Sequence, residues 1–547
     1  MSDLALLGNS FLPSERAASG WASLAGCRWQ FHYIGSAEVA KQILNWLEIA
    51  GDEPDAAALS QFLAPLPNDW AFIAVSSGYR VAATDKVRSY PLFFSSRRFP
   101  CLISPSARAI QEQTNSPFAE GAALIEFMLS GYVTGRDTLL ADIKQLQAGD
   151  LLLVPAKGDG LQLLRYYRYL PRPEERTAAE WVDDLAQTTE GIFKRMIESA
   201  QGRPLLLPLS GGLDSRLIVC MLRYLGYDNV RTFSYGLPNN HEAKIAAQVA
   251  ETAGFPWEFV PTSHSGFRKF FWSAERKDFW EIADGFCSIP TMQDVHPLKV
   301  LRERGLSDDT IVVNGQSGDF ISGGHIPASL LKAGDREALL DAVLNKHFAL
   351  RKSLRTPANL AAVSKRITKS FREIELAAGH PLPPAALYES WEWQERQCKY
   401  VIGGQRVYDW LGLNWRLPLW DADYLEFWSR VPFELKFGQR LYKEFLRSRD
   451  YCGLFKNFNP TVWRWPGATI AAVPVAQVVG LLGGRRTKDR FYDYARYIGH
   501  YGSYYAPWGW REFLRSSPDI RNPVTLFVDQ WLRENGIQGS AQSGQAT

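Results

Sequence analysis

The sequence has few cysteines, almost no net charge and no concentrated basic region. Its 547 residues contain only six cysteines, which lie far apart and form no C-x-x-C pair: Cys27, Cys101, Cys220, Cys287, Cys398 and Cys452. This spacing argues against a disulfide framework or a zinc site and is typical of reduced thiols in a cytoplasmic protein. Lys and Arg total 61 against 58 Asp and Glu. A nucleic-acid binder needs a basic face, so we expect no nucleic-acid partner.

An export signal and a clear membrane span are also missing. The start, MSDLALLGNSFLPSER, places no basic residues before a long apolar run, so we predict a cytoplasmic location. The uncharged segment Gly467–Gly484 approaches the length of a span and is followed by Arg485, Arg486 and Lys488. One proline, one glutamine and four glycines make it only mildly hydrophobic. The sequence therefore favours a buried or mobile segment of the soluble fold over membrane contact, and no integral span.

The chain is too long for one core, so we expect at least two domains. Up to about residue 160 the pattern is one of short strands, with hairpins around Gly78 and around residues 158–160. A segment rich in proline and charge, residues 170–181, separates this part from the rest. We divide the chain into residues 1–172, residues 173–535 and a disordered polar tail, residues 536–547.

The second part alternates strands with helices. We expect strands at 204–210, 230–236, 257–261 and 310–315, and helices at 177–199, 214–224 and 241–253. This alternation predicts an α/β fold in which helices cover both faces of a parallel sheet. From about Ala333 the pattern is helical and rich in aromatic residues, which predicts a helical C-terminal extension.

The strongest chemical signal is the hexapeptide Ser210-Gly211-Gly212-Leu213-Asp214-Ser215, between a predicted strand and a predicted helix. Glycines let the backbone approach a ligand closely, and the helix start offers N–H groups and a positive dipole end. The pattern predicts a polyphosphate cradle, and Asp214 would suit Mg²⁺ that neutralises pyrophosphate. The alternative is an ordinary strand-to-helix turn capped by Ser and Asp.

A second acidic residue follows another predicted strand. Asp319 lies in a loop with Gly315, Gly318, Gly323 and Gly324, where ligands gather in open α/β sheets. Carboxylates at the ends of two parallel strands can share one Mg²⁺. The alternative is that Asp319 only caps a turn.

These motifs resemble those of the ATP-pyrophosphatase (PP-loop) group, whose S-G-G-x-D-S loop binds ATP. The segments TFSYGLPNNHEAKIAAQVAETAG, VVNGQSGDFISGG and NWRLPLWDADYLEFWSRVPFELKF narrow the resemblance to the asparagine synthetase family, which includes β-lactam synthetases and lasso-peptide cyclases. The resemblance implies an adenine-nucleotide α-hydrolase-like domain with ATP and Mg²⁺ as cofactors. It places the metal on Asp214 and Asp319, and the nucleotide beside Pro208, Ser210, Gly211, Gly212, Leu213, Asp214, Ser215, Tyr235, Asn314 and Gly315.

The N-terminal part resembles a class II glutamine amidotransferase domain, an α+β Ntn-hydrolase-like β-sandwich. The matching segments are NDWAFIAVSSGYRVAATDKVRSYPLFFS and TLLADIKQLQAGDLLLV. That family uses a cysteine directly after Met1 as its nucleophile, whereas Ser2 and Asp3 follow Met1 here. Without a thiolate the domain lacks the means to hydrolyse glutamine. We therefore predict a degenerate, structural domain.

The catalytic residues also depart from the family pattern. Gln316 stands where asparagine synthetase has Glu, and it can bind a substrate but cannot take a proton. Glu392 or Glu395 is the alternative candidate for a general base. Adenylation requires a cation where charge develops. The candidates are Arg464, in the segment that matches the family's lysine motif, and Lys443 and Lys456 nearby.

The sequence as a whole predicts an AMP- and pyrophosphate-forming carbon–nitrogen ligase that adenylates a small carboxylate and transfers ammonia or an amine to it. The acceptor is left open between aspartate, a sugar uronate of a surface polysaccharide, and a peptide or amino-acid derivative that cyclises. Aromatic segments such as RFYDYARYIGHYGSYYAPWGW would suit stacking on sugar rings. The rivals are an RNA-modifying enzyme with the same loop and an inactive scaffold subunit. A homodimer is possible.

Overall fold

The structure is a computed structural model. It describes residues 20–97, 101–157, 160–331, 335–456, 474–484, 487–488, 491–492, 495, 507–509, 511, 519 and 521–537. Arg464, the residues around Met1, most of the predicted tail and the first part of the uncharged segment Gly467–Gly484 lie outside the described residues.

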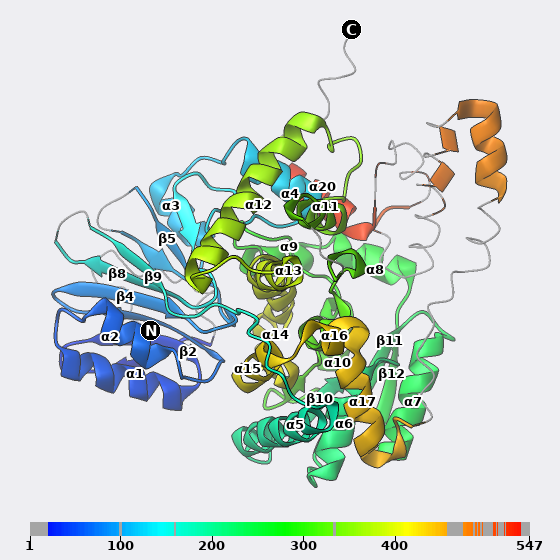
Figure 1. The fold of residues 1–547 in the computed structure, drawn as a ribbon, viewed down its shortest axis with the longest axis horizontal. Helices are drawn as coiled ribbons and strands as arrows, with labels where there is room; N and C mark the ends of the chain where they lie inside the picture. The colour runs from blue at the N-terminus through cyan, green and yellow to red at the C-terminus, as the bar shows by residue number, and fades with distance from the viewer. Residues whose placement is uncertain are drawn as a thin grey trace.

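The N-terminal part contains two antiparallel sheets (Figure 1). One sheet has six strands in the order β1-β2-β3-β4-β8-β9, and the other has three in the order β6-β5-β7. Their bounds are β1 Ala22–Ala25, β2 Gln30–Gly35, β3 Trp70–Val75, β4 Tyr79–Thr84, β5 Phe93–Ser95, β6 Ile103–Ser104, β7 Ile143–Gln145, β8 Asp150–Pro155 and β9 Gln162–Arg165. The predicted hairpin around Gly78 is the β3–β4 pair, and the second predicted hairpin is the β8–β9 pair.

Helices also occur in this part, although the strand-dominated sequence pattern did not reveal them. They are α1 Ala37–Ala50, α2 Ala56–Leu63, α3 Ala107–Thr114 and α4 Ala122–Ser130. Side-chain caps fix where two of them begin, because Ser36 accepts a hydrogen bond from the Val39 amide and Asp55 accepts one from the Ala58 amide. The mixture of sheets and helices agrees with the predicted α+β class.

The second part is built on a parallel sheet in the order β12-β11-β10-β13-β14. The strands are β10 Leu205–Pro208, β11 Val230–Gly236, β12 Trp257–Pro261, β13 Ile311–Val313 and β14 Asn414–Arg416, and the first connecting helices are α5 Ala178–Ala200, α6 Leu213–Tyr224 and α7 His241–Ala253. The predicted α/β parallel sheet is confirmed. The short edge strand β14 was not predicted.

Alternate residues of the sheet face two different cores. Leu205 and Leu207 pack into a core with α5, α6 and α7, whereas Leu206 packs into a second core. That second core also contains Phe93 and Leu152 from the N-terminal sheets. The two parts of the chain therefore share one continuous apolar core. The division at residue 172 remains a prediction; β9 ends at Arg165 and α5 begins at Ala178.

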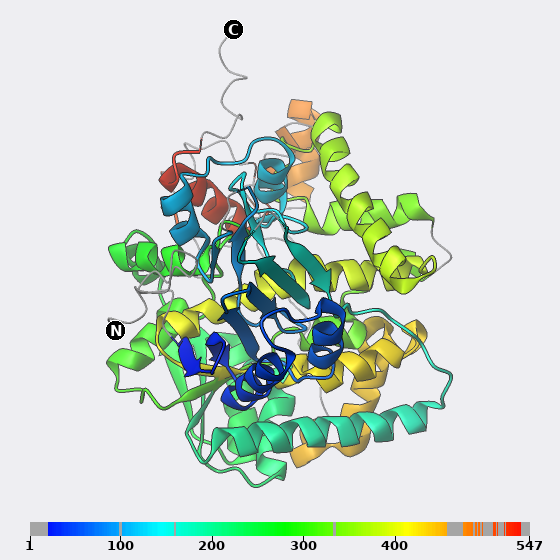
Figure 2. The ribbon, with the colours of Figure 1, turned by 90° about the vertical axis from the view of Figure 1, so that its left-hand side faces the viewer.

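The remaining helices surround the sheet and separate it from the N-terminal layer, which Figure 2 views from outside. They are α8 His264–Phe271, α9 Ala274–Ala283, α10 Val295–Glu303, α11 Arg336–His347, α12 Pro357–Ala378, α13 Pro384–Glu392, α14 Arg406–Trp410, α15 Ala422–Arg430, α16 Phe433–Lys436, α17 Arg440–Arg449 and α20 Pro523–Glu534. Shorter helical segments are η2 Phe320–Gly324, η3 Ala328–Leu330, η4 Trp393–Val401, η5 Ile402–Gln405, η6 Pro418–Trp420, η7 Phe437–Gln439 and η8 Tyr451–Gly453.

Residues 474–484 form a further helix whose larger apolar side chains are exposed. The buried alternative of the sequence interpretation is therefore wrong for this stretch. No helix in the described part of the chain is both long enough and apolar enough to cross a bilayer.

Candidate active site

The two predicted acidic loops meet at one edge of the parallel sheet. The loop Ser210–Ser215 connects β10 to α6, and the loop 314–319 follows β13. Because β10 and β13 are parallel neighbours, their carboxyl ends lie side by side.

Asp214 and Asp319 are in direct contact through the second loop. The Asp319 backbone amide donates a hydrogen bond to the Asp214 carboxylate, and the Tyr442 hydroxyl donates another at 2.9 Å. A Cβ on Gly318 would lie only 2.8 Å from Cγ of Asp214, and a Cβ on Gly315 would lie 2.8 Å from its Cβ. The close approach of the loop 314–319 to Asp214 therefore requires glycine at both positions.

Electrostatics at this pair favour a bound cation. Burial and the neighbouring Asp319 carboxylate raise the pKa of Asp214 to about 7. Asp319 remains exposed, with 57% of its side-chain surface accessible. Among the described residues no group of three or more His, Cys, Asp or Glu is arranged to hold a metal ion. Two carboxylates nevertheless suit Mg²⁺, which usually takes one or two protein carboxylates together with substrate phosphates.

The SGGLDS loop leaves the start of α6 without a side-chain cap. Gly212 is the N-cap residue, and no side chain bonds the first amides. The capped-turn alternative is therefore wrong. The Ser210 hydroxyl instead accepts a hydrogen bond from the Gly212 amide at 3.1 Å and lies 3.1 Å from the Ser215 hydroxyl. An uncapped helix start framed by two hydroxyls is a suitable site for phosphate oxygens.

Asp319 is one member of the acid pair, and its side chain also caps a turn. Its Oδ1 accepts a hydrogen bond from the Phe320 amide at 2.8 Å, while Oδ2 lies 3.1 Å from Nε2 of His325. Burial would lower the pKa of His325, but hydrogen bonds to Asp319 and Glu392 outweigh it and raise the pKa to about 9. His325 is thus a cation beside the site that the sequence analysis missed. Its only signal was its position directly after Gly323 and Gly324.

Two residues predicted to border the nucleotide have side chains that are already hydrogen-bonded to other residues of the protein. The Tyr235 hydroxyl donates to Asp294 at 2.5 Å, and the Asn314 amide donates to Tyr408 at 2.8 Å. Asn314 is buried. These groups hold the strand ends together, so a nucleotide would meet the backbone of Tyr235, Asn314 and Gly315. Pro208 is half-buried at the end of β10.

Gln316 belongs to a hydrogen-bonded pair with Gln405. Its Oε1 accepts from the Gln405 side-chain amide, and its backbone amide donates to Asn314 at 3.0 Å. The side chain is half-buried in the loop that follows β13. It can orient a substrate by hydrogen bonding, and its amide cannot serve as a base.

The predicted cations do not contact the acid pair in the described structure. Lys443 donates to the Gly438 carbonyl at 2.7 Å, and exposed Lys456 lies 3.6 Å from Asp450. Arg464 lies outside the described residues. Arg216, which sequence reasoning missed, is a buried cation in α6 that donates to the Gly211 carbonyl at 3.2 Å. It fixes the loop.

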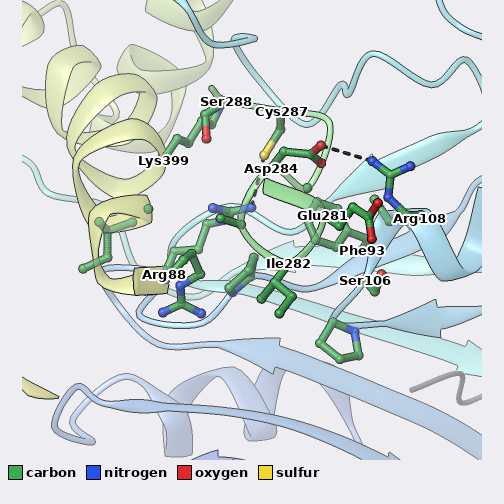
Figure 3. A pocket seen from close by; sticks show the side chains of 18 of the residues that line it. Arg88, Phe93, Ser106, Arg108, Glu281, Ile282, Asp284, Cys287, Ser288 and Lys399 are labelled. Atoms are coloured by element: carbon green, nitrogen blue, oxygen red, sulfur yellow. Dashed lines mark hydrogen bonds and ion pairs between the residues drawn. The ribbon is translucent and has the colours of Figure 1, made fainter. Parts of the chain in front are cut away.

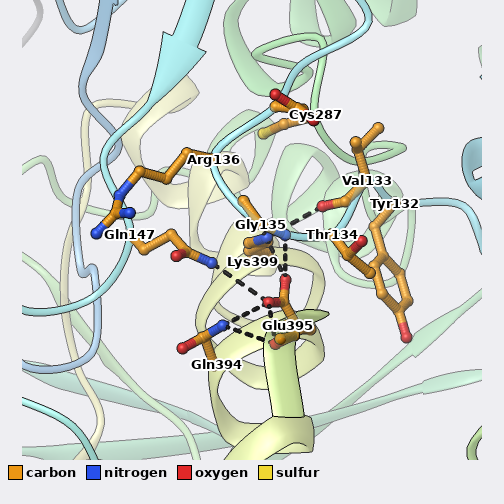
Figure 4. A network of polar contacts seen from close by, with 12 residues as sticks. Tyr132, Val133, Thr134, Gly135, Arg136, Gln147, Cys287, Gln394, Glu395 and Lys399 are labelled. Carbon is orange, nitrogen blue, oxygen red and sulfur yellow. Dashed lines mark hydrogen bonds and ion pairs between the residues drawn. The ribbon is translucent and has the colours of Figure 1, made fainter. Parts of the chain in front are cut away.

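Neither alternative base is accessible. Glu395 is fully buried and pairs with Lys399, whose ammonium also donates to the carbonyls of Val133 and Gly135 (Figure 4). Glu392 is fully buried and is held by His325 at 2.5 Å and by Lys346 at 3.2 Å. Burial would raise the pKa of both carboxyls, but their cationic neighbours lower it. Both residues therefore act as structural anions, and the sequence hypothesis of a base here is wrong.

The seam between the two parts encloses a small cavity (Figure 3). Its volume is about 30 Å³, and Arg88, Arg108, Asp284, Cys287 and Lys399 are among its lining residues. Arg108 pairs with Asp284 at 3.3 Å across the seam. The close fit shows that the N-terminal part is packed firmly on the second part.

Comparison with known proteins gives one family match. No curated protein matches the chain. Among solved structures, the glutamine phosphoribosylpyrophosphate (PRPP) amidotransferase from B. subtilis complexed with ADP and GMP is 11% identical, with a TM-score of 0.15 over 55% of this chain and 59% of that one. A structure of the allosteric regulatory enzyme of purine biosynthesis is 11% identical, with a TM-score of 0.16 over 55% and 58%. The chain thus spans less than two thirds of either protein.

Residues 194–452 match the family model described as asparagine synthase. The matched region contains both loops of the acid pair and all five strands of the parallel sheet, β10 to β14. Residues 194–452, just under half of the chain, therefore form a domain of the asparagine synthase family.

Proposed function

We propose that the protein is an ATP-dependent amide synthetase that releases AMP and pyrophosphate. Membership of the asparagine synthase family supports amide formation driven by ATP. The observation that carries the AMP-forming proposal is the uncapped start of α6 beside the Asp214–Asp319 pair. A helix start that binds phosphates next to two carboxylates suits a departing pyrophosphate.

The reaction has two steps. An oxygen of the substrate carboxylate attacks the α-phosphorus of ATP, the bond to the β-phosphate oxygen breaks, and an acyl-adenylate and pyrophosphate form. The nitrogen of ammonia or an amine then attacks the acyl carbon, loses a proton and displaces AMP, which leaves an amide.

Each residue has a defined part in this proposal. Ser210, Ser215 and the first amides of α6 bind the β- and γ-phosphates. Asp214 and Asp319 would hold Mg²⁺, which when bound would neutralise negative charge on the phosphates. Gln316 orients the acceptor by hydrogen bonding. Arg464 remains our candidate for the cation that stabilises charge in the transition state, with Lys443 and Lys456 as alternatives.

The nitrogen donor in this proposal is free ammonia or an amine. Gln316 and Gln405 supply amides where a base would be needed, so the donor must arrive already neutral or lose its proton to water or to the leaving group. The N-terminal part then serves as a structural layer. Its core is continuous with that of the synthetase part, which gives it a role without glutamine hydrolysis.

Incubation of the purified protein with ATP, Mg²⁺, ammonia and a panel of carboxylates tests the proposal. The panel contains aspartate, sugar uronates and amino-acid derivatives that can cyclise. Pyrophosphate and AMP should appear in equal amounts with one class of acceptor. Formation of ADP and phosphate would discard the mechanism, and glutamine should not replace ammonia.

A variant pair separates an enzyme from an inactive scaffold subunit. Asp214→Asn should abolish pyrophosphate release, because it removes a carboxylate that holds the metal. Asp228→Asn changes an exposed carboxylate elsewhere in the same domain and should leave the rate unchanged. A wild-type protein that binds no nucleotide would support the scaffold alternative.

A further inference from the structure

The helix 474–484 has the reverse of the usual burial pattern. Its large apolar side chains face solvent, with exposed fractions of 48% for Val475, 54% for Val478, 87% for Leu481 and 86% for Leu482. The side chain that faces inward is the small one of Ala476, which is fully buried, and Gly480 lies close to Lys488, because a Cβ there would be 2.9 Å from the Lys488 side chain. A helix of a soluble fold turns its large apolar residues to the core.

This apolar face is a cluster that has no counterpart in the described part of the chain. The other strongly exposed large hydrophobic residues there are Ile49, Tyr224, Trp272 and Leu376, and each lies in or beside a different helix. Single exposed residues of this kind are ordinary, whereas contiguous apolar patches mark interaction surfaces. Figure 1 draws the helix in orange at the outer edge of the molecule, where a flat partner can reach it.

Charge around the helix indicates which partner it suits. The sequence from 467 to 488 contains no acidic residue, and Arg485, Arg486 and Lys488 follow the helix directly. Lys488 lies along the helix, because its ammonium donates to the side chain of Gln477 at 2.7 Å. An apolar face that is followed in the sequence by a run of cations matches an anionic bilayer, in which leucines enter the acyl boundary and cations meet lipid phosphates.

We propose that the helix 474–484 docks the protein on the surface of an anionic lipid bilayer. Its eleven residues extend about 16 Å, too short to cross the hydrocarbon core, so the helix lies in the interface. The proposal is independent of the proposed function, because Val475, Val478, Leu481 and Leu482 take no part in the candidate active site.

Co-sedimentation of the full chain with vesicles tests the proposal. The protein should bind vesicles of phosphatidylcholine mixed with phosphatidylglycerol, bind pure phosphatidylcholine more weakly, and be released partly by added salt. Leu481→Asp combined with Leu482→Asp should lower the partition coefficient by tenfold or more, because two apolar side chains no longer enter the bilayer. Arg485→Gln combined with Arg486→Gln should lower it roughly tenfold on the anionic vesicles only.

Matched controls make the outcome decisive. Ile49→Asp and Leu376→Asp introduce the same chemical change at positions that are 88% and 80% exposed elsewhere, and they should bind like the wild type. Failure of the wild type to bind anionic vesicles would overturn the proposal, as would equal loss of binding in the controls. Gel filtration without lipid gives a further check. A wild-type oligomer that becomes a monomer in the leucine variant would assign the face to a second copy instead.

Discussion

Individual glycines determine whether the acid pair can form. The Gly318 Cα is so close to Asp214 that a methyl group would lie 2.8 to 2.9 Å from the carboxyl group. Gly318→Ala should therefore push Asp319 away from Asp214 and reduce pyrophosphate release by about a hundredfold, as expected for misplaced catalytic groups. The fold should persist, because the change lies in a loop. Circular dichroism and a pyrophosphate assay measure the two effects.

Gly160→Ala is the matched control for that substitution. A Cβ on Gly160 would meet no atom within 4 Å, and its backbone needs no left-handed conformation. It should retain full activity. An active Gly318→Ala enzyme would show that the contact between Asp214 and Asp319 is not needed.

The positive charge on His325 leads us to predict how the stability of the protein depends on pH. Its pKa is raised from 6.5 to about 9 in the folded state by Asp319 and Glu392, against the effect of burial. A raised pKa means that the stabilisation is fully present below pH 6.5 and is lost as the pH rises through 9. The free energy of unfolding should thus fall over this window by a few kcal/mol. His325→Gln should remove this part of the slope, and urea unfolding at several pH values measures it; an unchanged slope would contradict the assignment.

At the scale of elements, η4 carries the buried ion pair Glu395–Lys399, whose side chains also bond the backbone of Val133 and Gly135 in the N-terminal part. Lys399→Met leaves the Glu395 carboxylate without its partner in a site that excludes water. Removing one partner of such a pair typically costs about 3 to 5 kcal/mol, so we expect a loss of that size. Guanidinium unfolding followed by tryptophan fluorescence measures it.

The double variant Glu395→Gln with Lys399→Met tests the cause of that loss. With both charges removed, no uncompensated ion remains, and stability should return toward the wild-type value. If the double variant is as unstable as the single one, lost packing rather than charge is responsible.

Elements with strong local signals were predictable from the sequence, and others were not. The strands β11 and β12 and the helix α7 have the predicted bounds, because segments rich in β-branched and aromatic residues end at glycine or proline and Asn240 caps the helix. The edge strand β14 has three residues, and only its pairing with β13 makes it a strand. The partners of His325 and Gln316 come from α13 and η5, 67 and 89 positions away, and no local pattern encodes such contacts.

At the scale of the whole molecule, the two predicted domains share a core. Leu206 of the parallel sheet packs in the same cluster as Phe93 and Leu152 of the N-terminal sheets, and Lys399 and Arg406 donate hydrogen bonds to N-terminal carbonyls across the seam. Inter-domain contacts of independent domains are usually smaller and more polar. The division at residue 172 remains a prediction from the composition of the chain, and apolar packing continues across it.

This shared core predicts that the synthetase part cannot fold without the N-terminal part. A fragment that starts at residue 173 would expose apolar side chains that pack on the N-terminal part, such as Trp415 and Phe286, and would leave the Glu395–Lys399 pair without the carbonyls of Val133 and Gly135. Apolar surface that is exposed when half of a core is missing leads to aggregation or a loosely packed state. We expect the fragment to be insoluble or to unfold without a cooperative transition, while the full chain unfolds cooperatively. Co-expression with residues 1–172 should restore solubility, because the missing half of the core is supplied in trans. A soluble fragment with a sharp thermal transition and intact ATP-dependent activity would instead show that the N-terminal layer is dispensable, and the explanation for its retention would then have to be a function of its own.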